Sequence, residues 1–180
     1  MSGDRFQLAV IVGSVREGRF GPVVADWFVG QAKQRADVTV DVIDLADTTI
    51  PSASFADRIA AADAFVVVTP EYNHSYPGPL KHAIDSVGGG WRAKPVGFVS
   101  YGGMSGGLRA VEPLRIVFAE LHTATIRNTV SFHFAREQFD EHGTPRDPAG
   151  VNAAADVLLG QLTWWAWALR EARATRPYVA

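Results

Sequence analysis

Strand-like and helix-like patterns of apolar residues alternate along the chain. Stretches rich in β-branched and aromatic residues at Phe6–Val12, Val38–Leu45, Phe65–Thr69 and Val96–Ser100 are typical of strands in a buried sheet. We expect a fifth strand, a bent one, within Thr123–Phe132. The pattern therefore predicts five strands, each separated from the next by another element.

The segments between these strands have the apolar spacing of helices. One helix is expected to begin at Pro22, a short alanine-rich helix covers Ala56–Ala62, and a third follows Pro79. Apolar residues at helical spacing predict further helices over Leu108–Leu121 and about Val151–Arg173. Strands that alternate with helices favour a parallel sheet, because parallel neighbours require crossover connections.

Two segments fit this pattern less well. Pro113 removes the helical hydrogen bond to the carbonyl of Arg109, so we expect its helix to begin where Pro113 lies near the first turn. The polar segment Arg136–Gly150 is interpreted as a long loop and not as a domain boundary.

A chain of 180 residues has the length of one domain, since roughly 150 residues per domain is usual. We predict a single three-layer α/β/α domain over residues 1–180, with five parallel strands.

Composition excludes several classes of protein. Without cysteine the chain has no disulfide, no thiolate catalysis and no Cys-ligated metal or cluster, so any redox chemistry requires a cofactor. The 17 basic and 19 acidic residues form no basic footprint for nucleic acid. No apolar run approaches the ~20 residues of a membrane span, and the N-terminus does not read as a secretory signal. We expect a cytoplasmic protein with no nucleic-acid, membrane or metal partner.

Ligands of open parallel sheets bind beyond the carboxyl ends of the strands. The three loops that follow the first, third and fourth predicted strands are therefore the candidate binding loops. In the first, Gly13–Gly21, a hydroxyl at Ser14 and guanidinium groups at Arg16 and Arg19 precede a helix, and such a set suits a phosphate monoester. The loop is not a P-loop, because Arg19-Phe20 stands where Lys-Ser/Thr is required. The alternative is a flexible surface turn with solvated arginines.

The second loop, Thr69–Pro79, contains two aromatic residues, an amide and three prolines. This composition predicts a stiff platform for a flat ring, with Asn73 at the ring's polar edge. For His74 the alternatives are a base and a solvated or hydrogen-bonding residue, and a histidine in a loop is more often the latter. The third loop, Ser100–Gly107, has four glycines, which allow the backbone to approach a ligand closely. The alternative interpretation of the second and the third loop is a turn that only terminates the preceding strand.

Taken together, the three loops resemble the NADPH-dependent FMN reductase family. The resemblance rests on Gly-Ser-x-Arg-x-Gly-Arg, Pro-Glu-Tyr-Asn-His-Ser-Tyr-Pro-Gly-Pro and Ser-Tyr-Gly-Gly-Met-Ser-Gly-Gly, and it covers about Phe6 to Leu121. It implies a flavodoxin-like fold and an oxidoreductase that passes hydride from NADPH, or NADH, to FMN and then to a small acceptor. Quinones, free flavins, azo compounds and metal oxyanions are the acceptor classes that the family implies.

The resemblance implies a cofactor site and no catalytic residue, because FMN carries the hydride step. The residues assigned to FMN by position are Ser14, Arg16, Arg19, Phe20 and Gly21 at the phosphate, Pro70, Glu71, Tyr72 and Asn73 at the ring, and Ser100, Tyr101, Gly102 and Gly103 on the ring's other side. Relatives often carry Ser or Thr where this chain has Arg19. Arg19 is therefore also a candidate, with Arg16 and Arg109, for a contact to NADPH.

Two other functions fit parts of the sequence. Gly103–Gly107 matches the G-x-S-x-G motif of serine hydrolases, with Ser105 as nucleophile and Asp140 and His142 as the partners in order. That reading leaves the arginine-rich first loop unexplained. A flavodoxin that only carries electrons is the second alternative, but the near balance of acidic and basic residues does not favour an acidic docking face.

The last predicted helix has a surplus of aromatic residues. Trp164, Trp165 and Trp167 are too closely spaced to lie on one helix face, so we expect one or two of them to pack in the core. The rest either pack on a neighbouring subunit or are merely exposed at the helix end. With the family resemblance, this surplus predicts a homodimer or homotetramer whose flavin lies near a subunit interface.

Overall fold

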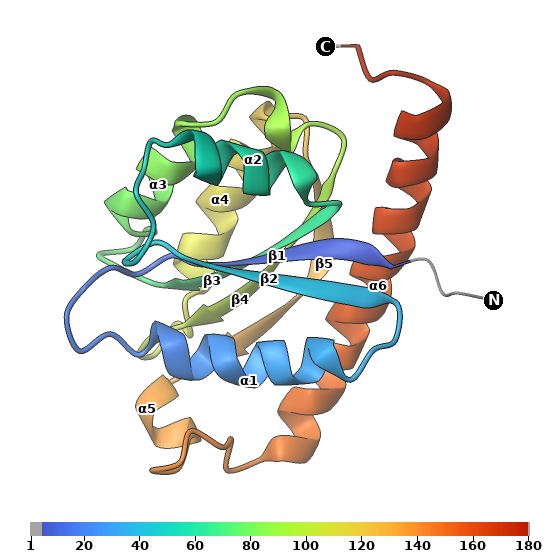
Figure 1. Cartoon of the computed structure of the whole chain (residues 1–180). Coiled ribbons are helices and arrows are strands. Elements are labelled where there is room, and N and C mark those ends of the chain that lie inside the picture. Colours follow the sequence, from blue (N-terminus) through green and yellow to red (C-terminus); the bar gives the residue numbers. More distant parts are fainter. Residues whose placement is uncertain (1–4, 180) are drawn as a thin grey trace.

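The structure, a computed structural model, describes residues 5–179 and has a five-stranded parallel sheet of strand order β2-β1-β3-β4-β5 (Figure 1). This confirms the predicted three-layer α/β/α fold. The elements in chain order are β1 (Phe6–Val12), α1 (Gly21–Lys33), β2 (Val38–Asp44), α2 (Ala53–Ala61), β3 (Ala64–Pro70), α3 (Gly78–Asp85), the 3₁₀ turn η1 (Gly89–Trp91), β4 (Pro95–Tyr101), α4 (Leu108–Glu120), β5 (Ala124–Phe132), α5 (Ala135–Gln138) and α6 (Pro148–Thr175).

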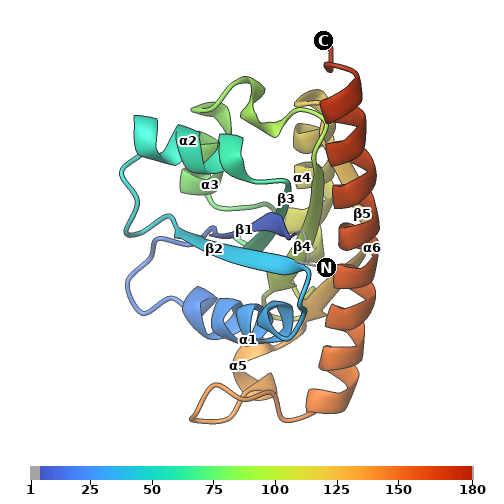
Figure 2. The same cartoon turned by 45° about the vertical axis from the view of Figure 1, so that its right-hand side comes forward.

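Helices cover both faces of the sheet. Figures 1 and 2 show α1 and α6 on one face and α2, α3 and α4 on the other. Each face has its own apolar core, one gathered around Phe28 and Leu162 and the other around Phe65 and Trp91. Every residue of β3 and β4 is buried, which explains why their sequences are almost uniformly apolar.

The strand order reverses direction at β1, which pairs with β2 on one side and with β3 on the other. The loops that follow β1 and β3 therefore leave the sheet at a topological switch point, where ligands of such folds bind. In this register Val12, the last residue of β1, lies beside Asp44 of β2 and Val68 of β3. The first two candidate loops consequently begin next to each other.

β5 is bent, as predicted. Its pairing with β4 shifts register between Val96 and Phe98, and such an irregularity bends a strand and increases its twist. Among the helices within residues 5–179, none has the combination of length and apolarity needed to cross a bilayer.

The expectation for Pro113 was wrong. Helix α4 begins at Leu108, so Pro113 lies in its interior. The helix begins this early because Gly107, at a φ of 87°, accepts hydrogen bonds from the N–H groups of Ala110 and Val111. The buried stripe of α4, which includes Leu114, holds the helix together despite the hydrogen bond that Pro113 cannot make.

The expected loop Arg136–Gly150 is also partly helical. Its beginning belongs to α5, and its end is already the first turn of α6, which the side chain of Asp147 caps by accepting from the N–H of Gly150 at 3.2 Å. Between them, Phe139 and Pro145 form an isolated antiparallel bridge. The segment is compact because Phe139 is buried against Phe132, with ring centroids 4.9 Å apart.

Lys94 is a buried cation far from these loops, at the start of β4. Its ammonium group donates to the carbonyls of Ile59 and Ala60, in the last turn of α2, at 2.9 and 2.8 Å. Cations at a helix C-terminus are favourable. Burial nevertheless lowers the pKa of Lys94 to about 8, because it penalises the charged form.

This pKa predicts that stability increases with pH above neutrality. Between the lowered pKa and the ordinary value of 10.5 the unfolded chain binds more protons than the folded chain, so the free energy of unfolding should rise by about 2 kcal/mol from about pH 7 to about pH 9.5. Urea unfolding at several pH values measures this. The Lys94→Met variant should lack the rise; an equal rise in both proteins would contradict the assignment.

Candidate functional site

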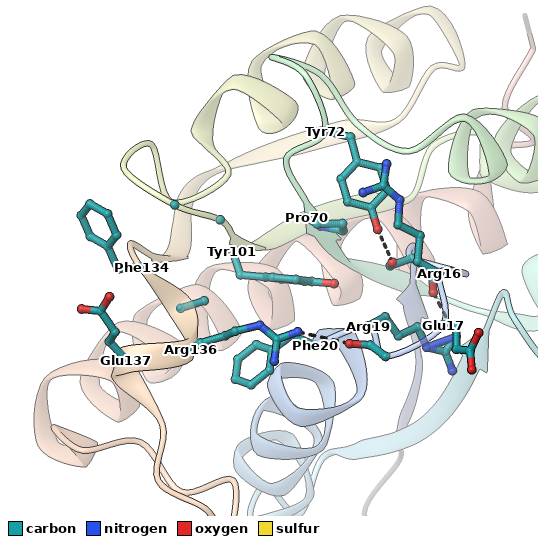
Figure 3. Close-up of a pocket in the computed structure, with 15 residues that line it drawn as sticks. Arg16, Glu17, Arg19, Phe20, Pro70, Tyr72, Tyr101, Phe134, Arg136 and Glu137 are labelled. Atoms are coloured by element: carbon teal, nitrogen blue, oxygen red, sulfur yellow. Dashed lines mark hydrogen bonds between the residues drawn. The ribbon is translucent and has the colours of Figure 1, made fainter.

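A pocket of about 490 Å³ lies at the carboxyl ends of β1, β3 and β4 (Figure 3). Its lining combines basic, aromatic and glycine residues from all three candidate loops and from the segment after β5. The lining residues are Ser14, Arg16, Glu17, Gly18, Arg19, Phe20, Pro70, Tyr72, Tyr101, Gly102, Gly103, Phe134, Ala135, Arg136 and Glu137.

The loops after β1 and β3 touch each other across the switch point. The Ser14 and Tyr72 hydroxyl oxygens lie 2.6 Å apart and form a hydrogen bond, and the Arg16 guanidinium stacks 3.6 Å from the centre of the Tyr72 ring (Figure 3). Of the two bonded hydroxyl groups, one keeps a hydrogen that can be donated to a ligand. The first N–H groups of α1, which follow this loop, lack intrahelical partners. This end of the pocket therefore offers donors to an anion.

Arg19 points away from this anion end, toward the edge of the sheet. Its guanidinium donates to the carboxylate of Asp44 at 2.7 Å and to the carbonyl of Ser14 at 3.0 Å. Both side chains of the ion pair are largely buried, at 15% and 21% exposure. Arg19 thus holds the loop in shape, and its charge is balanced by protein.

Phe20 and Gly21 set how α1 begins. The ring of Phe20 lies edge-on to Tyr101 at 6.3 Å. A Cβ at Gly21 would come within 2.8 Å of the Tyr101 hydroxyl, closer than real side chains approach, and within a tight 3.1 Å of Val12. Glycine here lets Tyr101 lie flat against the first turn of the helix.

The loop after β3 makes a tight two-residue turn. Tyr72 and Ser75 exchange backbone hydrogen bonds at 2.8 and 3.0 Å, and Asn73 and His74 between them have φ of 49° and 67°. Positive φ at both central positions is the pattern of a type I′ turn, which favours Asn. Asn73 therefore has a conformational role.

Glu71 fastens this loop to the start of α4. Its carboxylate accepts from the Ser105 hydroxyl, from the backbone N–H of Arg109 at 3.3 Å and from the Arg109 guanidinium at 3.4 Å. The same guanidinium lies 3.3 Å from Nε2 of His74. Arg109 is thus committed to protein groups, and Glu71 supports the pocket from behind its lining.

The same contacts weigh against the serine hydrolase. The partner of Ser105 is a carboxylate and not a histidine, whereas Asp140 accepts from the backbone of His142 and Thr144 at 2.9 and 2.8 Å within its own turn. In the part of the chain that the structure describes, neither Asp140 nor His142 hydrogen-bonds to Ser105.

The glycine-rich loop after β4 doubles back on its own strand. The buried Ser100 hydroxyl donates to the carbonyl of Gly106 at 2.8 Å, and a Cβ on Gly107 would come within 2.7 Å of Ser100. Ser100 therefore shapes the loop, while Gly102 and Gly103 reach the pocket. Of the thirteen predicted residues, all within the described range, nine line the pocket and four support it: Gly21, Glu71, Asn73 and Ser100.

The segment after β5 forms a wall that the sequence interpretation missed. Phe134, at a φ of 46°, donates its N–H to the carbonyl of Gly103 at 2.9 Å, and Ala135 donates to that of Gly102 at 3.0 Å. This brings Phe134, Arg136 and Glu137 to the pocket. The available signal was topological: a fifth parallel strand must end at the same edge as the others.

Tyr101 contributes an unpartnered polar atom. The residue is 5% exposed, and its hydroxyl has no hydrogen-bond partner among the described residues. Burial raises the pKa of Tyr101 above its ordinary value, so the group stays a donor at neutral pH. Buried donors are normally paired, so this one fits a ligand with acceptor oxygens. The phosphate and hydroxyl oxygens of FMN have that chemistry.

The strand order and the anion end of the pocket together define a flavodoxin-like protein. Solved structures agree on the fold. A flavoenzyme NAD(P)H:(acceptor) oxidoreductase from Paracoccus denitrificans superimposes with a TM-score of 0.70 at 21% identity, covering 89% of this chain and 97% of that one. A flavodoxin variant from Pseudomonas aeruginosa gives 0.58 at 18% identity, with 91% and 99% covered.

The sequence matches the NADPH-dependent FMN reductase family over residues 6–137, and the chain belongs to this family. The match extends past Leu121 and includes the Phe134–Glu137 wall. The family's description, NADPH-dependent FMN reductase, agrees with the expected class of enzyme, an oxidoreductase with FMN as cofactor and NAD(P)H as co-substrate.

Two relatives of known name align with more than half of the chain. An NAD(P)H-dependent FMN reductase of Schizosaccharomyces pombe is 35% identical over 120 residues, 56% of this chain and 60% of the relative. An FMN-dependent NADPH-azoreductase of Staphylococcus haemolyticus is 32% identical, with 69% and 75% covered. The chain thus spans less than two thirds of the yeast relative's length.

The unpartnered hydroxyl of Tyr101 predicts a gain of stability on its removal. Tyr101→Phe should raise the free energy of unfolding of the cofactor-free protein by about 1 kcal/mol, because an unsatisfied buried polar group is lost. The matched variant Tyr72→Phe should lower it by a similar amount, since it leaves the buried Ser14 hydroxyl without its partner. Urea unfolding compares the two, and a loss in both variants would contradict the assignment.

Proposed function

We propose that the protein is a cytoplasmic NAD(P)H-dependent oxidoreductase that binds FMN in this pocket and reduces a small acceptor. The observation that carries the proposal is the buried, unpartnered Tyr101 hydroxyl in a pocket at the strand-order switch. The arginines around the pocket supply the complementary charge for a phosphate. The family match supports the same ligand independently.

The residues fall into two groups along the pocket. The phosphate of FMN would be held by Ser14, Arg16 and the first N–H groups of α1. Phe20 lines the same end of the pocket. Pro70, Tyr72, Gly102 and Gly103 would line the isoalloxazine ring. FMN bound there would supply the chemistry of hydride transfer from NAD(P)H to the acceptor.

The protein's part in this chemistry is positional. Histidine is absent from the lining among the described residues, and its tyrosine hydroxyls are held by burial and hydrogen bonding. We assign no acid or base, because FMN would carry the hydride step without one. Stiff walls from the turn at Asn73 and from Phe134 hold the ring in one orientation, and fixed orientation is itself a large source of rate.

The acceptor is proposed to be a conjugated organic molecule. Relatives include the azoreductase and a 2-hydroxy-1,4-benzoquinone reductase of Burkholderia, which is 34% identical over 57% of this chain and 58% of its own length. Pro70, Tyr72 and the half-exposed Phe134 give the pocket aromatic and apolar surface for a flat acceptor. Free flavins and metal oxyanions remain the further classes to assay.

A visible spectrum tests the function. After FMN is added and the protein is desalted, we expect a retained flavin band that bleaches with NADPH under anaerobic conditions and returns with a quinone. Ser105→Ala should behave like the unaltered protein. A retained band that neither NADPH nor NADH bleaches would favour an electron carrier, and no bleaching with excess FMN would overturn the proposal.

We also propose that the protein self-associates through α6. Trp164 and Trp165 are 65% and 40% exposed and border a groove beside Thr125–Arg127 of the edge strand β5. Trp167 instead packs on Phe6, with ring centroids 6.0 Å apart. Exposed aromatic surface of this kind is typical of interfaces.

Sedimentation velocity tests the self-association. The unaltered protein is expected at the mass of a dimer or tetramer, and Trp164→Glu should shift it toward the monomer because a buried charge opposes association. Ile116→Glu, at another exposed apolar position, is the control and should leave the mass unchanged. A monodisperse monomer would refute the proposal.

A further inference from the structure

Three arginines border the anion end of the pocket, and the charge of one of them, Arg19, is already balanced by a carboxylate. Arg19 is neutralised by Asp44, and Arg16 lies flat on the ring of Tyr72. The third, Arg136, comes from α5 on the far side of the pocket and was not among the residues that the loop motifs indicated. Its surroundings differ from those of the other two.

Arg136 reaches across to the loop after β1. Its Nη2 donates to the carbonyl of Gly18 at 3.2 Å, and its guanidinium carbon lies 5.3 Å from the centre of the Phe20 ring. A guanidinium has five N–H donors. Within residues 5–179 no carboxylate pairs with Arg136, so most of its donors and its whole charge are available.

The reach of Arg136 is set by the fold. The backbone hydrogen bonds from Phe134 to Gly103 and from Ala135 to Gly102 fasten the start of α5 to the loop after β4. Arg136 follows directly after these two anchored residues. Its side chain therefore starts from a fixed point, and only the side-chain torsions are left to adjust to a ligand.

A second, independent donor faces the same end of the pocket. The buried Tyr101 hydroxyl has no partner, and its ring packs on Phe20, the residue over which Arg136 also lies. Figure 3 shows Tyr101 and Arg136 both directed toward the loop after β1, with Glu137 on the opposite side. A carboxylate, Glu17 of the loop after β1, also lines the pocket. A ligand group with several anionic oxygens can accept both from the Tyr101 hydroxyl and from the N–H groups of Arg136 that do not bond to Gly18.

We propose that Arg136 binds the phosphate monoester of FMN and thereby sets the preference of the pocket for FMN over riboflavin. The inference rests on the proposed function. Arg136 would close the phosphate end from the side opposite Ser14 and Arg16, so that the phosphate is held between the loop after β1 and α5. Charge-assisted hydrogen bonds of this kind are roughly twice as strong as neutral ones.

The test compares the affinities of two flavins that differ only in the phosphate. Quenching of flavin fluorescence gives the dissociation constants of FMN and riboflavin for the unaltered protein, Arg136→Gln, Arg136→Lys and Arg146→Gln. Arg146 is the matched control, an exposed arginine on the same segment outside the pocket lining. Circular dichroism confirms that each variant is folded.

In Arg136→Gln we expect FMN binding to weaken about 10-fold and riboflavin binding to change less than about twofold, in line with loss of a charge-assisted contact. Arg136→Lys should retain part of the FMN preference, and Arg146→Gln all of it. Unchanged FMN affinity in Arg136→Gln, or equal weakening of both flavins, would overturn the inference. If the unaltered protein binds neither flavin, the proposed function itself fails, which is a distinct outcome.

Discussion

The position of β1 in the interior of a parallel sheet is the constraint on which the site depends. Because β1 pairs on both sides, the chain must leave it first toward β2 and later return to β3, and the crossover helices then lie on opposite faces. The loop after β1 leads to α1 and the loop after β3 leads to α3, on opposite faces of the sheet. These two loops therefore diverge at the carboxyl ends of their strands and leave a crevice between them. The loop after β4 and the segment after β5 complete the lining of the pocket that opens there.

Support of the crevice is divided among residues that never enter it. Asp44 holds the loop after β1 through Arg19, and Glu71 holds the loop after β3 against α4. Gly21 and Gly107 act by lacking a side chain, since each allows an aromatic or backbone group to approach within contact distance. Motif residues in these loops thus serve conformation as often as they serve binding, and a motif alone does not separate the two roles.

Local sequence was sufficient for the strands and for the three candidate loops that follow them, because burial and helical spacing act over short distances. Local sequence was insufficient where contacts between residues far apart in the chain determine the direction or position of a side chain. The direction of Arg19 depends on Asp44, 25 residues later, and the position of Arg136 depends on backbone bonds between Phe134 and Gly103. Pro113 was misplaced for a similar reason, since the stripe that includes Leu114 outweighs one missing hydrogen bond.

The ion pair of Arg19 and Asp44 ties the anion loop to β2, an edge strand with one paired side. Edge strands open locally more easily than central ones. An opening at Asp44 would remove the carboxylate partner of Arg19, whose guanidinium also donates to the carbonyl of Ser14. A ligand held by the loop is therefore expected to slow amide hydrogen exchange at the end of β2, and fraying of that strand would weaken the hold on the ligand.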